Sequence, residues 1–313
     1  MIAQIKRHSL APHLALVLVQ VLFGTWPIVG KIALRSISST GLVAFRVTGA
    51  ALAFAILRRR LGQHTKPSRR DLVWLILCSL LGVVLNQFLF VKGLSLTTVI
   101  NATLLGTTIP VFTLLISISL GHDRPSLRRV SGILLAGAGV LYLVDPFRAT
   151  FSSGTTIGNV LIVANSLSYG AYIAISGNLF RRYGALNVIT LMFLVGAMIT
   201  LPVGVLTVDR ESLAAAGIGL WISLIYIVLL PTVAAYYLNA WALTRVRPST
   251  VAIYIYLQPL IAFGFAPLVL GEKWNSRTLI ASLLIFAGVG VVTKRARSSA
   301  AKEMSERPEA LAH

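Results

Sequence analysis

Residues 110–140 read PVFTLLISISLGHDRPSLRRVSGILLAGAGV, and residues 259–289 read PLIAFGFAPLVLGEKWNSRTLIASLLIFAGV. When the second stretch is moved back by 149 positions, proline falls on proline and Asp123-Arg124 falls on Glu272-Lys273. Both stretches then end on the same Ala-Gly-Val. Earlier in each half the shift is two or three residues smaller, which pairs Trp74 with Trp221. The chain therefore contains an internal repeat, which is typical of membrane proteins built from two related units.

The composition predicts that this protein lies in a lipid bilayer. Hydrophobic residues make up 56% of the chain and charged residues only 12%, and the mean hydropathy is +0.83. A water-facing surface does not tolerate so little charge. A helix needs about 20 apolar residues to cross the hydrocarbon core. Ten stretches reach or nearly reach that length: 13–34, 39–57, 72–92, 97–120, 128–146, 157–180, 186–208, 217–241, 249–270 and 277–294.

The expected fold class is an all-α membrane protein with ten transmembrane helices, arranged as two inverted five-helix repeats. The first repeat covers residues 1–146 and the second covers 157–294. Residues 295–313 form a cytoplasmic tail that is expected to be disordered. The fifth and tenth stretches have the shortest charge-free cores and occupy equivalent places in the two halves, which supports a division into five plus five.

The distribution of lysine and arginine predicts the orientation, because positively charged loops stay in the cytoplasm. Of the 28 such residues, 20 lie at the amino terminus, in the loops after helices two, four, six and eight, or in the tail, and seven lie in the opposite loops. Both termini are therefore expected in the cytoplasm of a multi-pass protein of the cell (inner) membrane. Five helices per repeat is an odd number, so the second repeat enters from the opposite side.

The formal charge of +19 does not indicate nucleic-acid binding, because the basic residues are scattered over short loops where orientation and anionic lipid explain them. A single cysteine, Cys78, excludes an intramolecular disulfide and is expected to be a packing residue. The five histidines show no ligand spacing, and no phosphate-binding glycine motif occurs. No metal and no cofactor are expected. The expected partners are a small organic solute and the bilayer, with no obligate protein partner evident.

A short motif around a proline occurs once in each half of the repeat. Residues 107–112 read TTIPVF, and residues 257–260 read LQPL, followed by Gly271-Glu272-Lys273. Phe45-Arg46, Lys92-Gly93-Leu94 and Gly158-Asn159-Val160 accompany them. In this order they resemble the drug/metabolite transporter (DMT) superfamily, in its EamA-like transporter family, over nearly the whole chain. The sequence departs from the family pattern at His122-Asp123, where Gly-Glu is usual, so His122 is given no role.

The resemblance implies a transporter of small organic solutes, usually an exporter, with a central cavity lined by helices three, four, eight and nine and by parts of one and six. Polar groups deep in such helices are costly in lipid, so they are expected to face a cavity or another helix. The candidate substrate-binding residues are Asn86, Gln87, Asn101, Thr107, Tyr237, Asn239, Trp241, Tyr254, Gln258 and Arg46. A mixture of amides, hydroxyls and aromatic walls suits amphipathic solutes.

Each candidate also has a structural interpretation. Threonine hydroxyls often bond to their own helix backbone. Tyrosine and tryptophan form interfacial belts, and Trp26, Trp74 and Trp221 are interpreted as membrane anchors. Pro110 and Pro259 are expected to bend helices four and nine and to free carbonyl groups near the cavity.

Among the charged residues Arg46 is the strongest candidate, because it lies about seven positions inside the second predicted helix, counted from the outer end of that helix. An uncompensated charge at that depth costs at least about 2.5 kcal/mol, so the side chain needs a partner or water. Two interpretations are open. Arg46 binds an anionic group of the substrate, or it snorkels and bonds to carbonyl groups of a neighbouring helix.

No aspartate or glutamate lies deep in any of the predicted helices. Small multidrug antiporters of the same superfamily use a membrane glutamate to exchange protons for cationic drugs. The sequence therefore favours transport of amino-acid-like or other neutral, zwitterionic or anionic metabolites, and proton-coupled drug efflux is the alternative. A membrane-embedded lipid-modifying enzyme would need clustered His, Asp or Glu at one membrane face, and the sequence shows no such cluster, so no enzymatic activity is expected. An appended soluble domain or a long loop would favour a scaffold or receptor subunit, and the sequence shows neither.

The expected mechanism is alternating access, in which one repeat rocks against the other around a site at the membrane midplane. Glycines are expected to permit the close helix contacts that such movement needs. The glycines singled out for this role are Gly82, Gly106, Gly170, Gly264 and Gly288.

Overall fold

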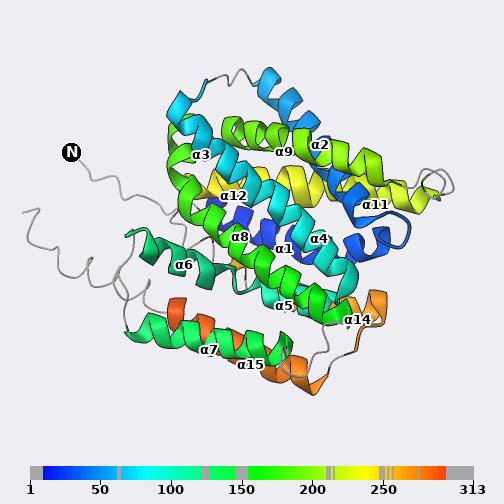
Figure 1. Ribbon diagram of the computed structural model, residues 1–313, viewed down its shortest axis with the longest axis vertical. Helices are drawn as coiled ribbons and strands as arrows, with labels where there is room; N and C mark the ends of the chain where they lie inside the picture. The colour runs from blue at the N-terminus through cyan, green and yellow to red at the C-terminus, as the bar shows by residue number, and fades with distance from the viewer. Residues whose placement is uncertain are drawn as a thin grey trace, which may run out of the picture.

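The computed structural model describes residues 10–61, 65–121, 127–144, 154–208, 216–246, 257–273 and 275–293, together with residues 213, 251, 254 and 255. Within these residues every regular element is helical (Figure 1). The order is α1 (Ala11–Ala33), α2 (Ser39–Arg60), α3 (Arg69–Ser79), the π-helical segment η1 (Leu80–Leu85), α4 (Asn86–Leu96), α5 (Val99–Gly106), α6 (Ile109–Ser119), α7 (Leu127–Val144), α8 (Gly154–Tyr183), α9 (Ala185–Thr207), α11 (Ile218–Val228), the π-helical segment η2 (Leu229–Ala234), α12 (Ala235–Leu243), α14 (Leu257–Leu270) and α15 (Ser276–Thr293). Asp123-Arg124, His122 and the tail lie outside the described residues.

Seven of the described helical stretches are long and apolar enough to cross a membrane. They include Arg69–Leu96, which runs unbroken from α3 through η1 to α4, and Val99–Ser119, which combines α5 and α6. Three further apolar helices are shorter, and two of these are the fifth and tenth segments, as the sequence predicts. The third is α14, because most of residues 249–256 lie outside the described part of the chain. The protein is therefore an all-helical, multi-pass membrane protein.

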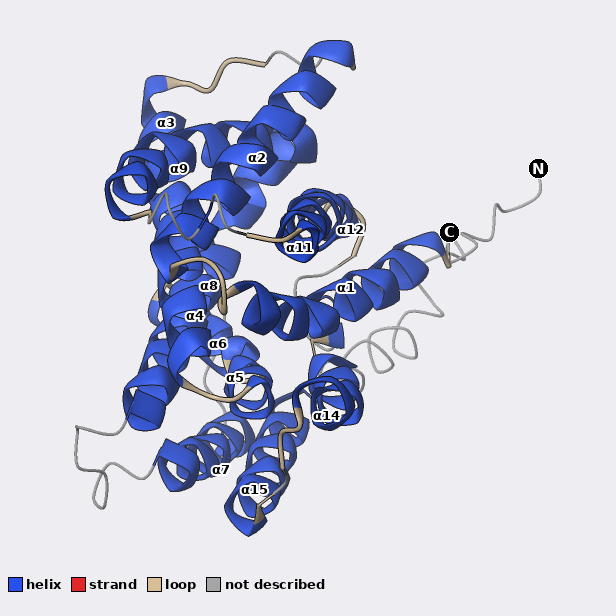
Figure 2. Cartoon of the chain, turned by 90° about the vertical axis from the view of Figure 1, so that its right-hand side faces the viewer, coloured by secondary structure: helices blue, strands red, loops and turns tan. Residues whose placement is uncertain are grey.

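Helices of the first half pack mainly on helices of the second half, and the packed pairs come in matching sets. α2 packs on α9, and α7 packs on α15. α4 packs on α8 just as α12 packs on α1, and α6 packs on α8 just as α14 packs on α1. In Figure 1 the α2–α9 pair lies at the top and the α7–α15 pair at the bottom, with α1, α4 and α8 between them. Figure 2 shows α1 between α12 and α14.

The two π-helical segments lie at equivalent places in the two halves. Their first residues are 80 and 229, which differ by 149. The helices that precede them begin at 69 and 218, and those that follow begin at 86 and 235, with the same difference of 149. The sequence shift of the repeat therefore holds through this part of the chain, and the pairing of Trp74 with Trp221, which are 147 apart, is wrong by two residues.

Close helix contacts also occur in matching pairs. A Cβ atom on Gly24 would lie 2.8 Å from Ile261, and one on Gly170 would lie 3.0 Å from Phe112. Ile261 and Phe112 are themselves 149 residues apart. Only glycine lets the backbones approach this closely without a shift of the neighbour.

Of the glycines singled out from the sequence, Gly82, Gly170 and Gly288 make such contacts. A Cβ atom on Gly288 would lie 2.3 Å from the backbone nitrogen of Ala136, which explains how α15 lies against α7. The expectation is wrong for Gly106 and Gly264, because a Cβ atom there would meet nothing within 4 Å.

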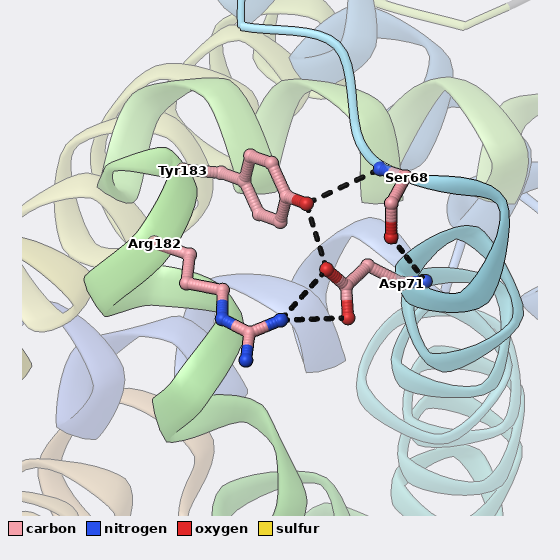
Figure 3. Close-up of polar contacts among 4 residues, drawn as sticks. All are labelled: Ser68, Asp71, Arg182 and Tyr183. Carbon is pink, nitrogen blue, oxygen red and sulfur yellow. Dashed lines mark hydrogen bonds and ion pairs between the residues drawn. The ribbon is translucent and has the colours of Figure 1, made fainter.

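An ion pair joins the two halves where α3 begins and α8 ends (Figure 3). The Asp71 carboxylate accepts hydrogen bonds from Nη1 of Arg182, with Oδ2 at 3.0 Å, and from the Tyr183 hydroxyl at 2.7 Å. Ser68 caps α3 by accepting a hydrogen bond from the Asp71 backbone N–H at 3.1 Å. An acidic residue in the first turn is also favoured by the helix dipole.

A second polar junction lies at the other end of the Arg69–Leu96 stretch. The Glu272 carboxylate accepts the backbone N–H groups of Val99 at 2.7 Å and Ile100 at 3.0 Å, which are the first residues of α5. Nζ of Lys31 donates to the carbonyl groups of Leu94 at 2.7 Å and Thr97 at 2.6 Å, where α4 ends. A carboxylate at a helix start and an ammonium at a helix end both match the helix dipole.

Candidate functional site: a polar cavity between the two halves

A cavity of about 90 Å³ lies among helices of both halves. Six amide side chains, two tyrosines and a set of apolar groups line it. The lining residues are Gln20, Phe23, Trp26, Pro27, Arg46, Asn86, Gln87, Phe90, Ala102, Thr103, Gly106, Ile109, Asn165, Tyr169, Ile173, Tyr236, Asn239, Val251, Ile255 and Gln258.

Arg46 of α2 is buried in the cavity wall, with 2% of its surface exposed. Its Nε donates to the Thr232 hydroxyl at 2.6 Å, and its Nη1 donates to Oε1 of Gln87 at 2.9 Å. Its Nη2 donates to the carbonyl oxygen of Pro231 at 3.3 Å. The guanidinium also lies over the ring of Trp26, 4.0 Å from the centroid. Arg46 therefore bonds to a neighbouring helix carbonyl, as one interpretation expected, but it faces the cavity instead of snorkelling to the surface.

The hydrogen bonds continue from Arg46 into both halves. Nε2 of Gln87 donates to the Tyr236 hydroxyl at 3.0 Å, and Tyr236 donates to Oδ1 of Asn86 at 3.4 Å. Residues 87 and 236 are 149 apart, so they occupy equivalent positions of the repeat. The Asn86 carbonyl accepts a hydrogen bond from Asn165 of α8 at 2.8 Å. These bonds fix the amide groups of the cavity wall in one orientation, which favours selective binding.

The other side of the cavity is also held by amides and aromatic rings. Nε2 of Gln258 on α14 donates to Oε1 of Gln20 on α1 at 2.6 Å. Phe23 packs edge-on against Tyr236, with ring centroids 5.9 Å apart. Trp26 packs against Phe90 at 6.2 Å. The wall thus combines polar groups with apolar surface, which is the composition of small-molecule sites.

Five of the ten predicted binding residues line this cavity. They are Arg46, Asn86, Gln87, Asn239 and Gln258.

Two predicted residues of the Val99–Ser119 stretch lie outside the cavity. Thr107 is fully buried, and its hydroxyl donates to the Leu104 carbonyl at 2.6 Å, as the structural interpretation of threonine expected. Oδ1 of Asn101 accepts a hydrogen bond from Thr278 of α15 at 3.4 Å. Thr107 therefore bonds to the backbone of its own segment, and Asn101 joins α5 to α15.

Three predicted residues of the second half also lie outside the cavity. The Tyr254 hydroxyl bonds to Nδ1 of His13 at 2.8 Å, and Trp241 lies under the guanidinium of Arg245 at 4.0 Å. Tyr237 packs against the apolar core.

The two prolines that were expected to bend helices, Pro110 and Pro259, each lie in the first turn of a helix. Pro110 stands at the start of α6, and α5 and α6 are separated by a turn at Thr107 and Thr108. Pro259 is the third residue of α14, and residue 256 before that helix lies outside the described residues. A proline in the first turn leaves no helical hydrogen bond broken. At the α5–α6 break, Thr108 and Ser166 both donate to the carbonyl group of Leu105, at 2.6 Å and 3.2 Å.

Sequence reasoning missed several cavity residues. Gln20 and Asn165 are polar residues in midspan, so the signal that singled out Gln87 applies to them too. The interpretation of Trp26 as an interfacial anchor is wrong, because it is 4% exposed and lies in the cavity wall. Tyr169 carries no signal that separates it from a packing residue. Trp74 and Trp221 are partly exposed, which agrees with anchoring.

Charge is distributed unequally in this site. Among the described residues, the cavity lining contains one cation and no carboxylate. The two carboxylates that the structure describes, Asp71 and Glu272, are bonded elsewhere. The described part of the chain contains no group of three or more His, Cys, Asp or Glu side chains that could hold a metal ion. Cys78 is buried in the apolar core, as expected for a packing residue.

Comparison with known proteins gives the same architecture. The model of the EamA-like transporter family matches residues 10–144 and again residues 156–294. A solved structure, titled only as the crystal structure of a protein, has a TM-score of 0.65 and 19% identity, and the match covers 91% of this chain and 98% of that one. At that identity the likeness concerns the fold alone.

Three curated relatives illustrate the range of similar proteins. An uncharacterized transporter of Archaeoglobus fulgidus is 29% identical over 294 residues, covering 90% of this chain and 97% of the relative. A probable terminal-alkyne amino-acid exporter of Streptantibioticus cattleyicolor is 26% identical, covering 85% and 87%. The Arabidopsis thaliana protein WALLS ARE THIN 1 is 21% identical, covering 88% and 81%.

A multi-pass helical bundle with a polar cavity between its two halves defines a membrane transport protein. The chain belongs to the EamA-like transporter family, because that family's model matches almost its whole length. It is a transporter of the drug/metabolite superfamily and not an enzyme.

Proposed function

We propose that this protein is a secondary transporter of the cell (inner) membrane that exports small organic solutes by alternating access. The solutes are amino-acid-like or other neutral, zwitterionic or anionic metabolites. The observation that carries this proposal is the cavity, because its wall combines six amides with aromatic surface and is contributed by both halves. A solute bound there contacts both halves at once, so movement of one half against the other can expose it to either side.

The matching packing of the two halves supports an inverted repeat of five plus five helices. The packing of α4 and α6 on α8 has its counterpart in the packing of α12 and α14 on α1. The π-helical segments are 149 residues apart. Seven described helices have spanning length, and α7, α14 and α15 complete the ten in this proposal. Ten spans place both termini on the same side of the membrane, and the distribution of lysine and arginine favours the cytoplasm.

The proposed solute class has support from one relative. The protein of Streptantibioticus cattleyicolor is named a probable amino-acid exporter, and it is similar to this chain over most of both lengths.

Counterflow in proteoliposomes tests transport directly. Purified full-length protein is reconstituted, the vesicles are loaded with a mixture of unlabelled amino acids and organic acids, and labelled members are added outside one at a time. We expect transient accumulation of at least one solute, and we expect Gln258→Ala to reduce it. No accumulation above protein-free vesicles for any member of a broad metabolite set would contradict the proposal.

Thiol labelling tests the topology. In a Cys78→Ser background, Ser36→Cys lies after α1 and Thr65→Cys lies before α3. An impermeant maleimide added to intact cells is expected to label position 36 and not position 65. Equal labelling of both positions, or the reverse, would contradict the proposed orientation.

Collapse of the pH gradient tests coupling. Since the cavity wall contains no carboxylate among the described residues, we expect exchange or uniport without proton coupling. Net uptake of labelled solute into unloaded vesicles is expected to reach the same level with and without an imposed pH gradient, and a protonophore is expected to leave it unchanged. Accumulation above equilibrium that needs the pH gradient and is abolished by the protonophore would favour proton coupling instead.

A further inference from the structure

Arg46 carries a charge that the described protein does not balance. Its three hydrogen-bond acceptors are a hydroxyl, an amide oxygen and a backbone carbonyl, all of them neutral. Among the described residues the carboxylates are those of Asp71, which bonds to Arg182, and Glu272, which bonds to backbone N–H groups of α5. A buried charge without a counter-charge is costly, and an anion placed beside it would remove part of that cost.

Arg46 also keeps donors for such an anion. A guanidinium has five N–H groups, and the bonds to Thr232, Gln87 and Pro231 use one each on Nε, Nη1 and Nη2. Among the bonds to described residues, one N–H therefore remains on each terminal nitrogen, and a guanidinium can use N–H groups of both terminal nitrogens to bond to the two oxygens of a carboxylate. Trp26 covers one face of the guanidinium and holds its plane.

The rest of the cavity wall suits an apolar body. Phe23, Phe90, Ile109 and Ile173 line it, and Trp26 extends the same apolar surface up to the guanidinium. Among the described lining residues a positively charged group would meet no carboxylate, only amide and hydroxyl oxygens and aromatic rings, and it would share the cavity with Arg46. An amphipathic solute therefore fits with its anionic end at Arg46 and its apolar end against these side chains.

We infer that Arg46 determines the specificity of the cavity, by binding the carboxylate of small organic solutes that carry an apolar body. This inference rests on the proposed transport function and narrows its substrate class. The α-amino group of an amino acid is not required for binding, so carboxylates with and without it are ligands, whereas the corresponding amides and amines are not. The same chemistry would accept a small inorganic anion such as chloride, and the experiment separates these two sources.

A matched ligand series tests the inference on the purified full-length protein. 4-Methylpentanoate, 4-methylpentanamide and 4-methylpentylamine share one branched body and differ in charge, and L-leucine adds an α-amino group. Binding is measured by titration calorimetry and by the shift in thermal unfolding, in chloride-free HEPES buffer and again with chloride. We expect the carboxylate and L-leucine to bind at least about tenfold more tightly than the amide and the amine, because only they pair with a guanidinium.

Two variants assign the discrimination to Arg46. Arg46→Gln is expected to reduce the preference for the carboxylate over the amide to less than about twofold, and Arg46→Lys to keep part of it, since an ammonium keeps the charge and loses the paired geometry. Arg182→Gln is the matched control and is expected to bind like the wild type. Because the comparison of ligands on the wild type needs no variant, misfolding of a variant would not remove the test.

The outcomes separate the two proposals. Equal affinity for carboxylate, amide and amine on the wild type would overturn the inference, while counterflow of any solute would still support transport. Discrimination that survives Arg46→Gln would also overturn it. Stabilisation by chloride with no gain from the organic carboxylate would assign Arg46 to an inorganic ion and overturn the organic substrate class. Arg46-dependent carboxylate binding without any counterflow would leave the binding site standing and contradict the transport function.

Discussion

Arg46 and Arg182 are both arginines that link the two halves of the protein, and the structure treats their charges in opposite ways. The Arg182 side chain is 66% exposed and pairs with the Asp71 carboxylate at 3.0 Å (Figure 3). Arg46 is 2% exposed and bonds only to neutral acceptors among the described residues. The protein supplies a counter-charge where water already screens the charge, and it supplies none where the charge is most costly.

This difference indicates different roles. An exposed ion pair contributes at most about 1 kcal/mol to stability, so the Arg182–Asp71 pair is a local contact between α8 and α3. A buried charge held by hydrogen bonds and an aromatic ring is costly for stability alone. Its presence in a cavity wall is explained if a ligand completes the charge balance. Substitutions of each arginine and of its neighbours test this difference in role.

The largest effect is expected for Arg46→Met, which keeps much of the side-chain volume and removes the charge. Counterflow of L-leucine is expected to fall by at least about 30-fold, which corresponds to about 2 kcal/mol for loss of one partner of a buried charge pair. Arg182→Met is expected to keep the wild-type rate within about twofold. Equal losses in the two variants would remove the distinction between the two arginines.

A smaller effect is expected for Trp26→Leu. The ring lies 4.0 Å from the Arg46 guanidinium, and a desolvated cation–π contact contributes about 0.5–2 kcal/mol. The affinity for 4-methylpentanoate, measured by calorimetry, is therefore expected to fall by about 2- to 30-fold. Trp221→Leu, which changes a partly exposed tryptophan outside the cavity lining, provides the control and is expected to leave the affinity unchanged. A larger loss at Trp221 would be inconsistent with this account.

Much of the fold could be predicted from the sequence, because hydrophobic length and an internal repeat are properties of whole segments. The expected segments 39–57 and 186–208 correspond to α2 (Ser39–Arg60) and α9 (Ala185–Thr207). The π-helical segments were not predicted. A single wider turn changes the local hydrogen-bond pattern without changing hydropathy, so no apolar count detects it.

Half of the residues named from the sequence do not line the cavity, although three of them, Asn101, Tyr237 and Trp241, lie in helices that contribute other lining residues. In α12, Tyr236 and Asn239 line the cavity, whereas Tyr237 does not, because neighbouring residues on a helix point about 100° apart. The same holds in α5 for Thr103 against Asn101. Residue type predicts that a polar side chain needs a partner, but the facing helix decides whether that partner is a cavity or another side chain.

Asp71→Asn is expected to change stability slightly and binding not at all. The substitution removes the charge that pairs with Arg182, and because the Arg182 side chain is 66% exposed, the loss is expected to be about 1 kcal/mol or less. Thermal unfolding of the purified protein measures the change, and the affinity for 4-methylpentanoate is expected to match the wild type. Loss of binding would place the Asp71 cluster in the functional site, contrary to the comparison.

The smallest effect is expected from salt. Because exposed charges are screened by ions, a roughly tenfold increase in ionic strength is expected to reduce the difference in thermal stability between the wild type and Asp71→Asn. The buried Arg46 is screened much less, so the preference for carboxylate over amide is expected to persist at the higher ionic strength. A preference that disappears with salt would indicate binding at an exposed charge.

A structure of the protein with 4-bromophenylacetate would show directly what Arg46 binds, because the bromine marks the apolar end by anomalous scattering. We expect the bromine among the apolar side chains of the cavity and the carboxylate oxygens within about 3 Å of the terminal nitrogens of Arg46. A carboxylate bound elsewhere, with Arg46 keeping only its bonds to Thr232, Gln87 and Pro231, would show that Arg46 is not the carboxylate site.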